Sequence, residues 1–131
     1  MSLLVVGVLA CLSLVAGCVN RTVTVPLSAG SVRVPEGDIL EVEMGEVNPS
    51  IGDAWFLVDP PESGVLIAIG RDIESEDVPG SGGPMTWSFA AHRAGTATLT
   101  FQYCYQTTLQ DCRGKNEEPA PDPVRLRVTV E

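Results

Sequence analysis

Few residues in this sequence have the type and spacing that catalysis requires. The one histidine, His92, precedes Arg93 beside a turn signal, and a lone histidine in that setting is ordinarily a solvated surface residue. The Gly-Ser-Gly-Gly run at 80–83 has the composition of a phosphate-binding loop, but neither a lysine nor a helical pattern follows it. No Gly-x-Ser-x-Gly nucleophile motif is present. The sequence therefore predicts no enzymatic activity and no cofactor.

The acidic residues do not form a recognisable metal site. Those between Asp72 and Asp77 lack the glycine and the ligand spacing of a known calcium loop, so a solvated acidic loop is the preferred interpretation. The formal net charge is −9, and most of the 17 acidic residues lie between Glu36 and Asp77, where Arg71 is the one base. Such a surface repels nucleic acid, which we exclude as a partner, and we expect no bound metal.

The first 17 residues have the pattern of an export signal. The apolar run 3–14 is too short to span a membrane and has the length of a signal-peptide core. The sequence Ala16-Gly17-Cys18 at its end resembles the processing site of bacterial lipoproteins, in which the cysteine thiol accepts the lipid. We predict a signal peptide over 1–17 and a lipid-anchored domain over 18–131. A plain secretory signal is the alternative, because Met1-Ser2 carries no positive charge.

Export has consequences for location and for the other cysteines. We expect a lipid anchor on the bacterial envelope, facing the periplasm or the surface, and Val19 in place of Asp favours the outer membrane. In an oxidising compartment Cys104 and Cys112 are predicted to form a disulfide, since two thiols and a distant His92 make a poor metal site. Closing so short a loop stabilises a fold by about 2–3 kcal/mol in the chain-entropy model.

Alternating apolar and polar residues, separated by turn residues, predict an all-β domain. No segment after residue 18 repeats apolar residues at helical spacing over the length of a helix. Pro26 indicates an edge strand or a strand end, and the continuous apolar run 65–69 indicates a well-buried strand. We predict an antiparallel, immunoglobulin-like β-sandwich of seven or eight strands. The expected strands are 21–25, 31–34, 39–44, 55–58, 65–69, 85–89, 96–105 and 124–130.

This strand order places three loops at one end of the sandwich. They are 48–54, the glycine-rich loop 78–84, and 105–115, which the predicted disulfide restrains. In the first of them Pro49 fixes its own φ, Gly52 can adopt a positive φ, and the Asn48 side chain can bond the nearby backbone. Stiff loops on a rigid sandwich are a common recognition surface, because little ordering entropy is lost on contact.

These loops resemble those of the chagasin family, which are proteinaceous inhibitors of papain-like cysteine proteases. The family carries an Asn-Pro-Thr-Thr-Gly loop followed by an aromatic position and Trp, and residues 48–55 read Asn-Pro-Ser-Ile-Gly-Asp-Ala-Trp. Its second loop contains Gly-Gly and enters an aromatic strand, as 82–89 does here. An Ala-Gly turn then leads into a strand that ends in Tyr, as 94–103 does.

The resemblance implies reversible inhibition without chemistry by the inhibitor, in which three loops plug the active-site cleft of a papain-like cysteine protease. We expect a monomer that uses no cofactor. Trp55 and Phe89, which lie within alternating strands, are expected in the core. The residues that the resemblance assigns to protease binding are Asn48, Pro49, Ser50, Ile51, Gly52, Gly82, Gly83, Pro84, Met85, Trp87 and Tyr105.

The sequence departs from the family in two places. The family's third loop carries Arg-Pro-Trp after the Tyr strand, where this chain has Cys104-Tyr105-Gln106-Thr107-Thr108, so Tyr105 and the disulfide would replace that contact. In the first loop Ser50-Ile51 replaces Thr-Thr and Asp53 stands where an aromatic residue is usual, and both changes are expected to alter target choice. The alternative function is a non-inhibitory envelope lipoprotein that keeps the sandwich and serves as an adhesion, assembly or ligand-binding module.

Overall fold

The computed structural model describes residues 20–59, 61, 64–74 and 80–131. The predicted signal peptide, the lipidation site Cys18 and the acidic residues Glu76 and Asp77 lie outside the described residues. Within the described part, no helix is long and apolar enough to cross a membrane.

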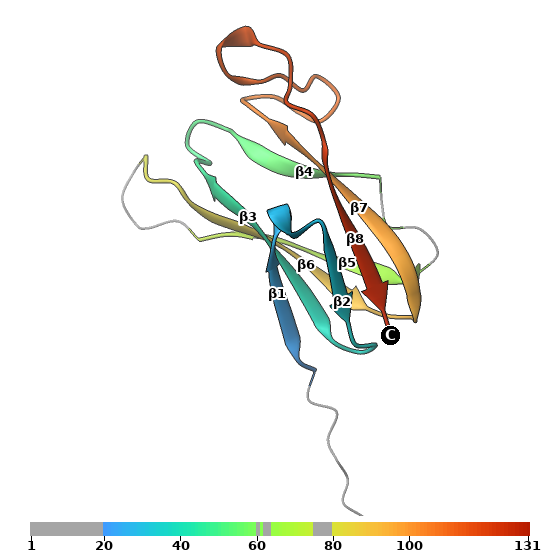
Figure 1. Ribbon diagram of the computed structural model, residues 1–131. Helices are drawn as coiled ribbons and strands as arrows, with labels where there is room; N and C mark the ends of the chain where they lie inside the picture. The colour runs from blue at the N-terminus through green and yellow to red at the C-terminus, as the bar shows by residue number, and fades with distance from the viewer. Residues whose placement is uncertain (1–19, 60, 62–63, 75–79) are drawn as a thin grey trace, which may run out of the picture.

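In the part of the chain that the structure describes, eight strands form two four-stranded sheets that pack face to face (Figure 1). The first sheet has the order β1-β3-β6-β5 and the second has the order β2-β8-β7-β4. Within the described residues, the short 3-10 helices η1 and η3 lie in the connections. The elements are β1 (Thr22–Pro26), η1 (Leu27–Ala29), β2 (Ser31–Val34), β3 (Ile39–Val47), β4 (Ala54–Val58), β5 (Leu66–Ile73), β6 (Gly83–Ala91), β7 (Gly95–Cys104), η3 (Lys115–Glu117) and β8 (Val124–Val130).

The strand pairing confirms the predicted β-sandwich and adds one feature to it. β3, β6 and β5 pair antiparallel, as do β4, β7 and β8. The edge strands β1 and β2 instead pair parallel with β3 and β8. The chain reverses at η1 and again after β2, so β1 and β3 run in the same direction. Pro26, which has no N–H to donate, ends the edge strand β1, as predicted.

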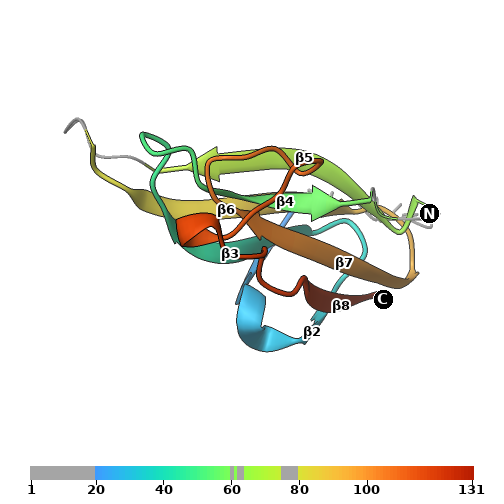
Figure 2. The same ribbon diagram turned by 90° about the horizontal axis from the view of Figure 1, so that it is seen from above.

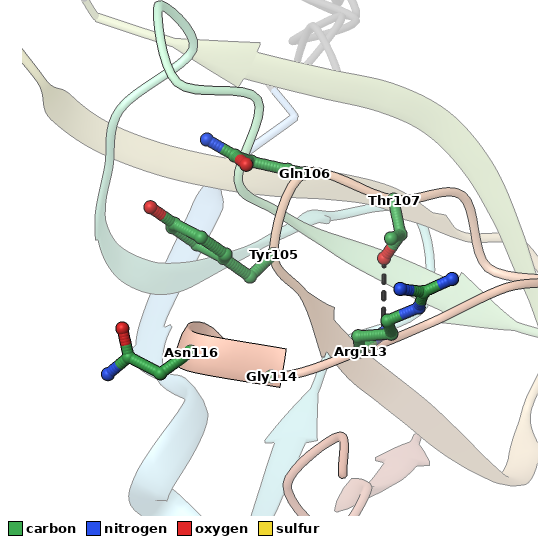
Figure 3. A pocket seen from close by; sticks show the side chains of 6 residues that line it. All are labelled: Tyr105, Gln106, Thr107, Arg113, Gly114 and Asn116. Atoms are coloured by element: carbon green, nitrogen blue, oxygen red, sulfur yellow. Dashed lines mark hydrogen bonds between the residues drawn. The ribbon is translucent and has the colours of Figure 1, made fainter. Parts of the chain in front are cut away.

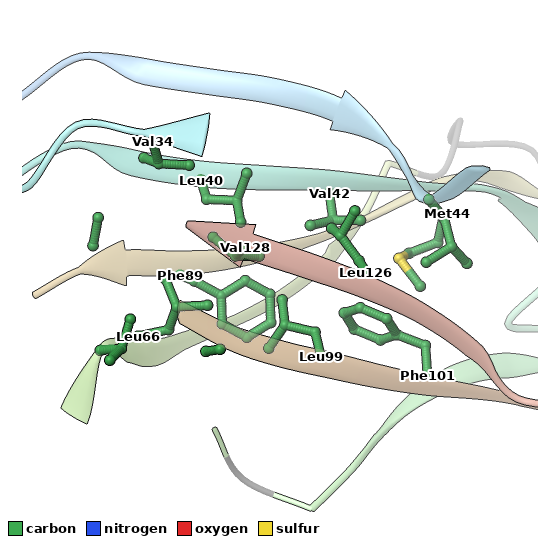
Figure 4. Packing of buried hydrophobic residues seen from close by; sticks show 14 of the residues in the cluster. Val34, Leu40, Val42, Met44, Leu66, Phe89, Leu99, Phe101, Leu126 and Val128 are labelled. Atoms are coloured by element: carbon green, nitrogen blue, oxygen red, sulfur yellow. The ribbon is translucent and has the colours of Figure 1, made fainter. Parts of the chain in front are cut away.

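The core lies between the two sheets and consists of side chains that point inward from the strands (Figure 4). Phe89 of β6 and Phe101 of β7 face each other across it, with their ring centres 6.2 Å apart, and both are fully buried. Trp55 is partly buried and packs against this cluster. The expected core position of Phe89 is therefore confirmed, and Trp55 closes the core at the end where the loops lie.

The prediction that 65–69 is well buried is wrong for most of that run. Val65 and Leu66 are buried, but Ile67 and Ile69 have 47% and 59% of their surface exposed. β5 is an edge strand, and its register with β6 shifts between Ala68 and Gly70. The irregularity turns side chains out of the alternating pattern. The strand also continues to Ile73, through a stretch that was predicted to be irregular.

We expect substitutions at buried and at exposed positions to differ sharply in their effect on stability. Phe89→Ala should lower the free energy of unfolding by about 3–5 kcal/mol, because it removes a fully buried ring. Ile69→Ala should cost less than about 1 kcal/mol, because most of the side chain is already in water. Urea unfolding of both variants measures the difference, and equal losses would contradict the exposed position of Ile69.

Candidate functional site

Three loops meet at the end of the sandwich where β3, β5 and β7 finish (Figure 1). We call 48–53 the first loop, 74–82 the second loop and 105–123 the third loop; the described part of the second loop is 74 and 80–82. The Asn48 Nδ2 donates to the Gly80 carbonyl oxygen at 3.1 Å, which joins the first loop to the second. A Cβ at Gly52 would lie 3.6 Å from the Cα of Gln106, so the first and third loops are also in contact (Figure 2).

The tip of the first loop is held by hydrogen bonds within the loop itself. The Asn48 side-chain oxygen accepts from the Ser50 N–H at 3.0 Å, and its carbonyl accepts from the Ile51 N–H at 3.1 Å. The Gly52 N–H donates to the Pro49 carbonyl at 3.2 Å, and Gly52 has a φ of +81°. Pro49, Ser50, Ile51 and Gly52 are exposed, and 40% of the Ile51 surface is open to solvent. The tip therefore presents a preformed turn with one apolar side chain.

A buried carboxylate closes the base of this loop. Asp53 is 7% exposed, and its Oδ1 accepts from the Asn48 N–H at 2.6 Å. Its Oδ2 accepts from the Tyr103 hydroxyl of β7, also at 2.6 Å. The Tyr103 ring contacts Trp55 edge to face at 5.5 Å. The sequence did not reveal this role, although it contained a signal. Asp53 and Trp55 are two residues apart, so an extended chain that directs Trp55 inward directs Asp53 inward as well.

Tyr103 remains a donor because its environment disfavours ionisation. Burial, the hydrogen bond to Asp53 and the negative charge of Asp53 together raise the pKa of Tyr103 well above its ordinary value of about 10. The hydroxyl therefore keeps its proton, and its bond to Asp53, throughout the neutral range.

The second loop presents fewer of the predicted contact residues than expected. Met85 is fully buried, so its assignment to an exposed binding surface is wrong. The reason is that Met85 shares the inward phase of β6 with Trp87 and Phe89. Trp87 is half-buried, and its Nε1 donates to the Trp55 carbonyl at 3.2 Å.

The glycines at the start of β6 serve close packing. A Cβ at Gly82 would lie 2.8 Å from the Val47 carbonyl oxygen, so only glycine lets the second loop approach the end of β3 this closely. Gly83 is buried, whereas Gly82 and Pro84 are exposed beside the first loop. Of the predicted residues in this region, Gly82 and Pro84 remain available at the surface.

The third loop is restrained by a disulfide and by hydrogen bonds, and it surrounds a hollow. The predicted Cys104–Cys112 disulfide is present. The Tyr105 N–H donates to the Arg113 carbonyl at 2.8 Å, and the Arg113 N–H donates to the Thr107 hydroxyl at 3.1 Å. Gln106 and Asn116 adopt left-handed backbone conformations, with φ of +52° and +58°. Together these residues surround a hollow of about 330 Å³ (Figure 3), lined by Tyr105, Gln106, Thr107, Arg113, Gly114 and Asn116.

The described residues of the loop end contain no grouped metal ligands, and the one histidine lies elsewhere. No three His, Cys, Asp or Glu side chains within this part of the chain are grouped to hold a metal ion. His92 is exposed just after β6, at the opposite end from the loops, where its N–H donates to the Val65 carbonyl.

Comparison with known proteins assigns the chain to a family. The model of the chagasin family of peptidase inhibitors, I42, matches residues 33–118, well over half of the chain. The chain belongs to the chagasin family. The members of this family are peptidase inhibitors, so this chagasin-family chain is not an enzyme, as its sequence predicted. The match extends from β2 to the end of η3 and contains the first and second loops completely.

Solved structures support the fold of this chagasin-family chain. The cysteine protease inhibitor EhICP2 from Entamoeba histolytica is 16% identical, with a TM-score of 0.63 over 88% of this chain and 100% of that chain. The solution structure of amebosin is also 16% identical, with a TM-score of 0.59 over 85% of this chain and 98% of that one. No curated protein sequence matches the chain.

The Tyr103–Asp53 bond predicts a pH dependence in the alkaline range. Because the pKa of Tyr103 is raised in the folded chain, the stability it contributes is fully present below the ordinary tyrosine pKa of about 10 and is lost as pH rises through the raised value. Ultraviolet titration of tyrosinate should show this tyrosine ionising late, and Asp53→Ala should lower its pKa. A Tyr103 titration that Asp53→Ala leaves unchanged would contradict the contribution assigned to Asp53 and leave burial as the cause.

Proposed function

We propose that this chain reversibly inhibits papain-like cysteine proteases by inserting its three loops into the active-site cleft. The observation that carries the proposal is the joining of three loops at one end of a sandwich whose sequence belongs to a peptidase-inhibitor family. The similar fold of EhICP2, which is a cysteine protease inhibitor, supports this protease class as the target.

The first loop is the proposed plug. Its exposed residues Pro49, Ser50, Ile51 and Gly52 would lie over the catalytic cysteine and histidine and exclude substrate. Ile51 is the exposed apolar side chain of the tip, and it would enter an apolar subsite of the cleft. Because the turn is already formed by hydrogen bonds within the loop, little conformational entropy remains to be lost on binding.

The other two loops would add contact area on either side of the plug. Gly82 is exposed beside Asn48, Pro84 is exposed where it pairs with Glu46 of β3, and Tyr105 lines the hollow of the third loop. The disulfide and the backbone bonds of Tyr105 and Arg113 restrain the third loop before any partner arrives. The third loop would thus supply a rigid flank in place of the Arg-Pro-Trp contact of the family.

We also propose that the chain is a monomer held to the bacterial envelope by lipid on Cys18, after removal of residues 1–17. The topology suits such an anchor. Thr22 of β1 pairs with Ile39, at the start of β3, whereas the first loop follows the end of β3. A tether before β1 would therefore leave the sandwich at the end opposite the loops and keep them free for a protease.

Titration of papain with soluble chain 20–131, which carries all eight strands, tests the inhibitory function. We expect reversible inhibition with a Ki between about 1 nM and a few micromolar, the range of specific protease–inhibitor contacts. If the chain at tens of micromolar inhibits none of several papain-like proteases, the proposal is refuted. A non-protease partner recovered from envelope extract would then favour the alternative of a binding or assembly module.

Gly52→Val should weaken inhibition by about tenfold or more, because a β-branched residue strains the positive φ at the tip. Gly37→Val is the matched control. Gly37 also has a positive φ, of +92°, and open space around it, but it lies in the turn between β2 and β3 at the far end. Both variants should lose similar stability, and only Gly52→Val should raise the Ki for papain.

The lipid anchor has its own test. Expressed in a bacterium with labelled palmitate, the full-length chain should incorporate label and remain in the membrane fraction. Cys18→Ser should abolish both, because serine lacks the thiol that accepts the lipid. A wild-type chain that is exported, cleaved and unlabelled would instead support the plain secretory signal.

A further inference from the structure

Asp53 and the first loop depend on each other. A buried carboxylate is unfavourable unless donors replace the lost water, and each oxygen of Asp53 accepts one short hydrogen bond. One donor, the Asn48 N–H, belongs to the opposite end of the same loop. Both oxygens of the carboxylate are therefore satisfied only while the two ends of the loop stay together.

The same bond determines what Asn48 does with its other groups. While Asp53 holds the Asn48 N–H, the Asn48 side-chain oxygen accepts from Ser50 at the tip and its Nδ2 donates to Gly80 of the second loop. Three polar groups of Asn48 thus connect the base of the first loop, its tip and the second loop. A change in the position of Asn48 would disturb all three.

Tyr103 fixes the carboxylate from the other side. It lies on β7, where it pairs with Trp55 of β4, and it directly precedes Cys104 at the base of the third loop. Its hydroxyl is held by strand pairing and by the ring contact with Trp55, so it provides an immobile donor for Asp53. The carboxylate therefore joins the first loop to the rigid end of the sandwich.

We propose that Asp53 is a positioning residue that fixes the first loop in its protease-binding shape, acting through the Asn48 N–H and the Tyr103 hydroxyl. The inference rests on the proposed function, in which this loop enters the protease cleft. Without the carboxylate the loop ends separate, and only a fraction of the molecules keeps the binding-competent turn. The apparent affinity then falls by that fraction.

Four variants of soluble chain 20–131 separate this role from general stabilisation. Asp53→Ala removes both acceptors. Asp53→Asn keeps an oxygen for the Asn48 N–H and can donate its amide to the Tyr103 oxygen, so it is the conservative rescue. Tyr103→Phe removes one donor and leaves the first loop sequence intact. Glu43→Ala, which removes an exposed carboxylate on β3 outside the three loops, is the control with the same change of charge.

The first readout needs no protease. In the free chain, hydrogen exchange of the Asn48 amide should be at least about tenfold faster in Asp53→Ala than in wild type, because a hydrogen bond to a charged group is lost. The amides of the core strands β3, β6 and β7 should keep their protection. Asp53→Asn should stay within about threefold of wild type, and Glu43→Ala should exchange at the wild-type rate. An Asn48 amide that exchanges equally in Asp53→Ala and wild type would overturn the inference.

The second readout is inhibition of papain. Asp53→Ala and Tyr103→Phe should each raise the Ki by about tenfold or more, and Asp53→Asn and Glu43→Ala should not. An unchanged Ki in a folded Asp53→Ala variant with a fast-exchanging Asn48 amide would refute the positioning role. If wild type inhibits no such protease, the proposed function fails, whereas the exchange result still decides whether Asp53 holds the loop. If Asp53→Ala does not fold, Tyr103→Phe provides both readouts.

Discussion

The shape of the loop end depends on a buried negative charge that must be compensated from two sides. Asp53 lies within the protein, where an ionised carboxylate is stable only with well-aligned donors. The strand β7 supplies one donor through Tyr103, and the first loop supplies the other through the Asn48 N–H. The register between β4 and β7, which sets Tyr103 opposite Trp55, thus determines the conformation of a loop outside both sheets.

Much of the fold could be predicted because the sequence signals for its strands and turns are local. Alternation of apolar and polar residues defines most strands, and the number of chain reversals places three loops at one end. The prediction that 65–69 is well buried was wrong, because a continuous apolar run does not distinguish an edge strand from a central one. Ile67 and Ile69 are exposed because β5 has one neighbour and a shifted register, which are properties of the whole sheet.

The candidate site was predicted less completely, for a related reason. The first loop was correctly recognised as a stiff turn from Asn48, Pro49 and Gly52. Met85 was assigned to the contact surface because it is close to the loop in sequence, but strand phase places it in the core. The role of Asp53 depends on Tyr103, which lies 50 residues away in the sequence. A hydrogen bond of that separation cannot be inferred before the pairing of β4 with β7 is known.

The third loop is held in place although it lacks the family's Arg-Pro-Trp motif. The disulfide holds its base, and the Gln102 side chain of β7 donates to the Pro121 carbonyl at 2.8 Å, so the loop folds back over the outer face of the second sheet. Two residues with left-handed backbone then shape the hollow beside Tyr105. The restraint of this loop therefore comes from a covalent bond and from hydrogen bonds to the backbone.

The proposed anchor and the loops divide the sandwich into two ends with different tasks. β3 has nine residues, and a strand of that length spans about 30 Å. If lipid on Cys18 holds the chain at the start of β1, the loops would lie about that far from the membrane surface, beyond the lipid headgroups. A protease in the aqueous compartment could then reach them from the open side. The sandwich would act as a rigid spacer, and the same strands that carry the loops would determine how far from the membrane inhibition takes place.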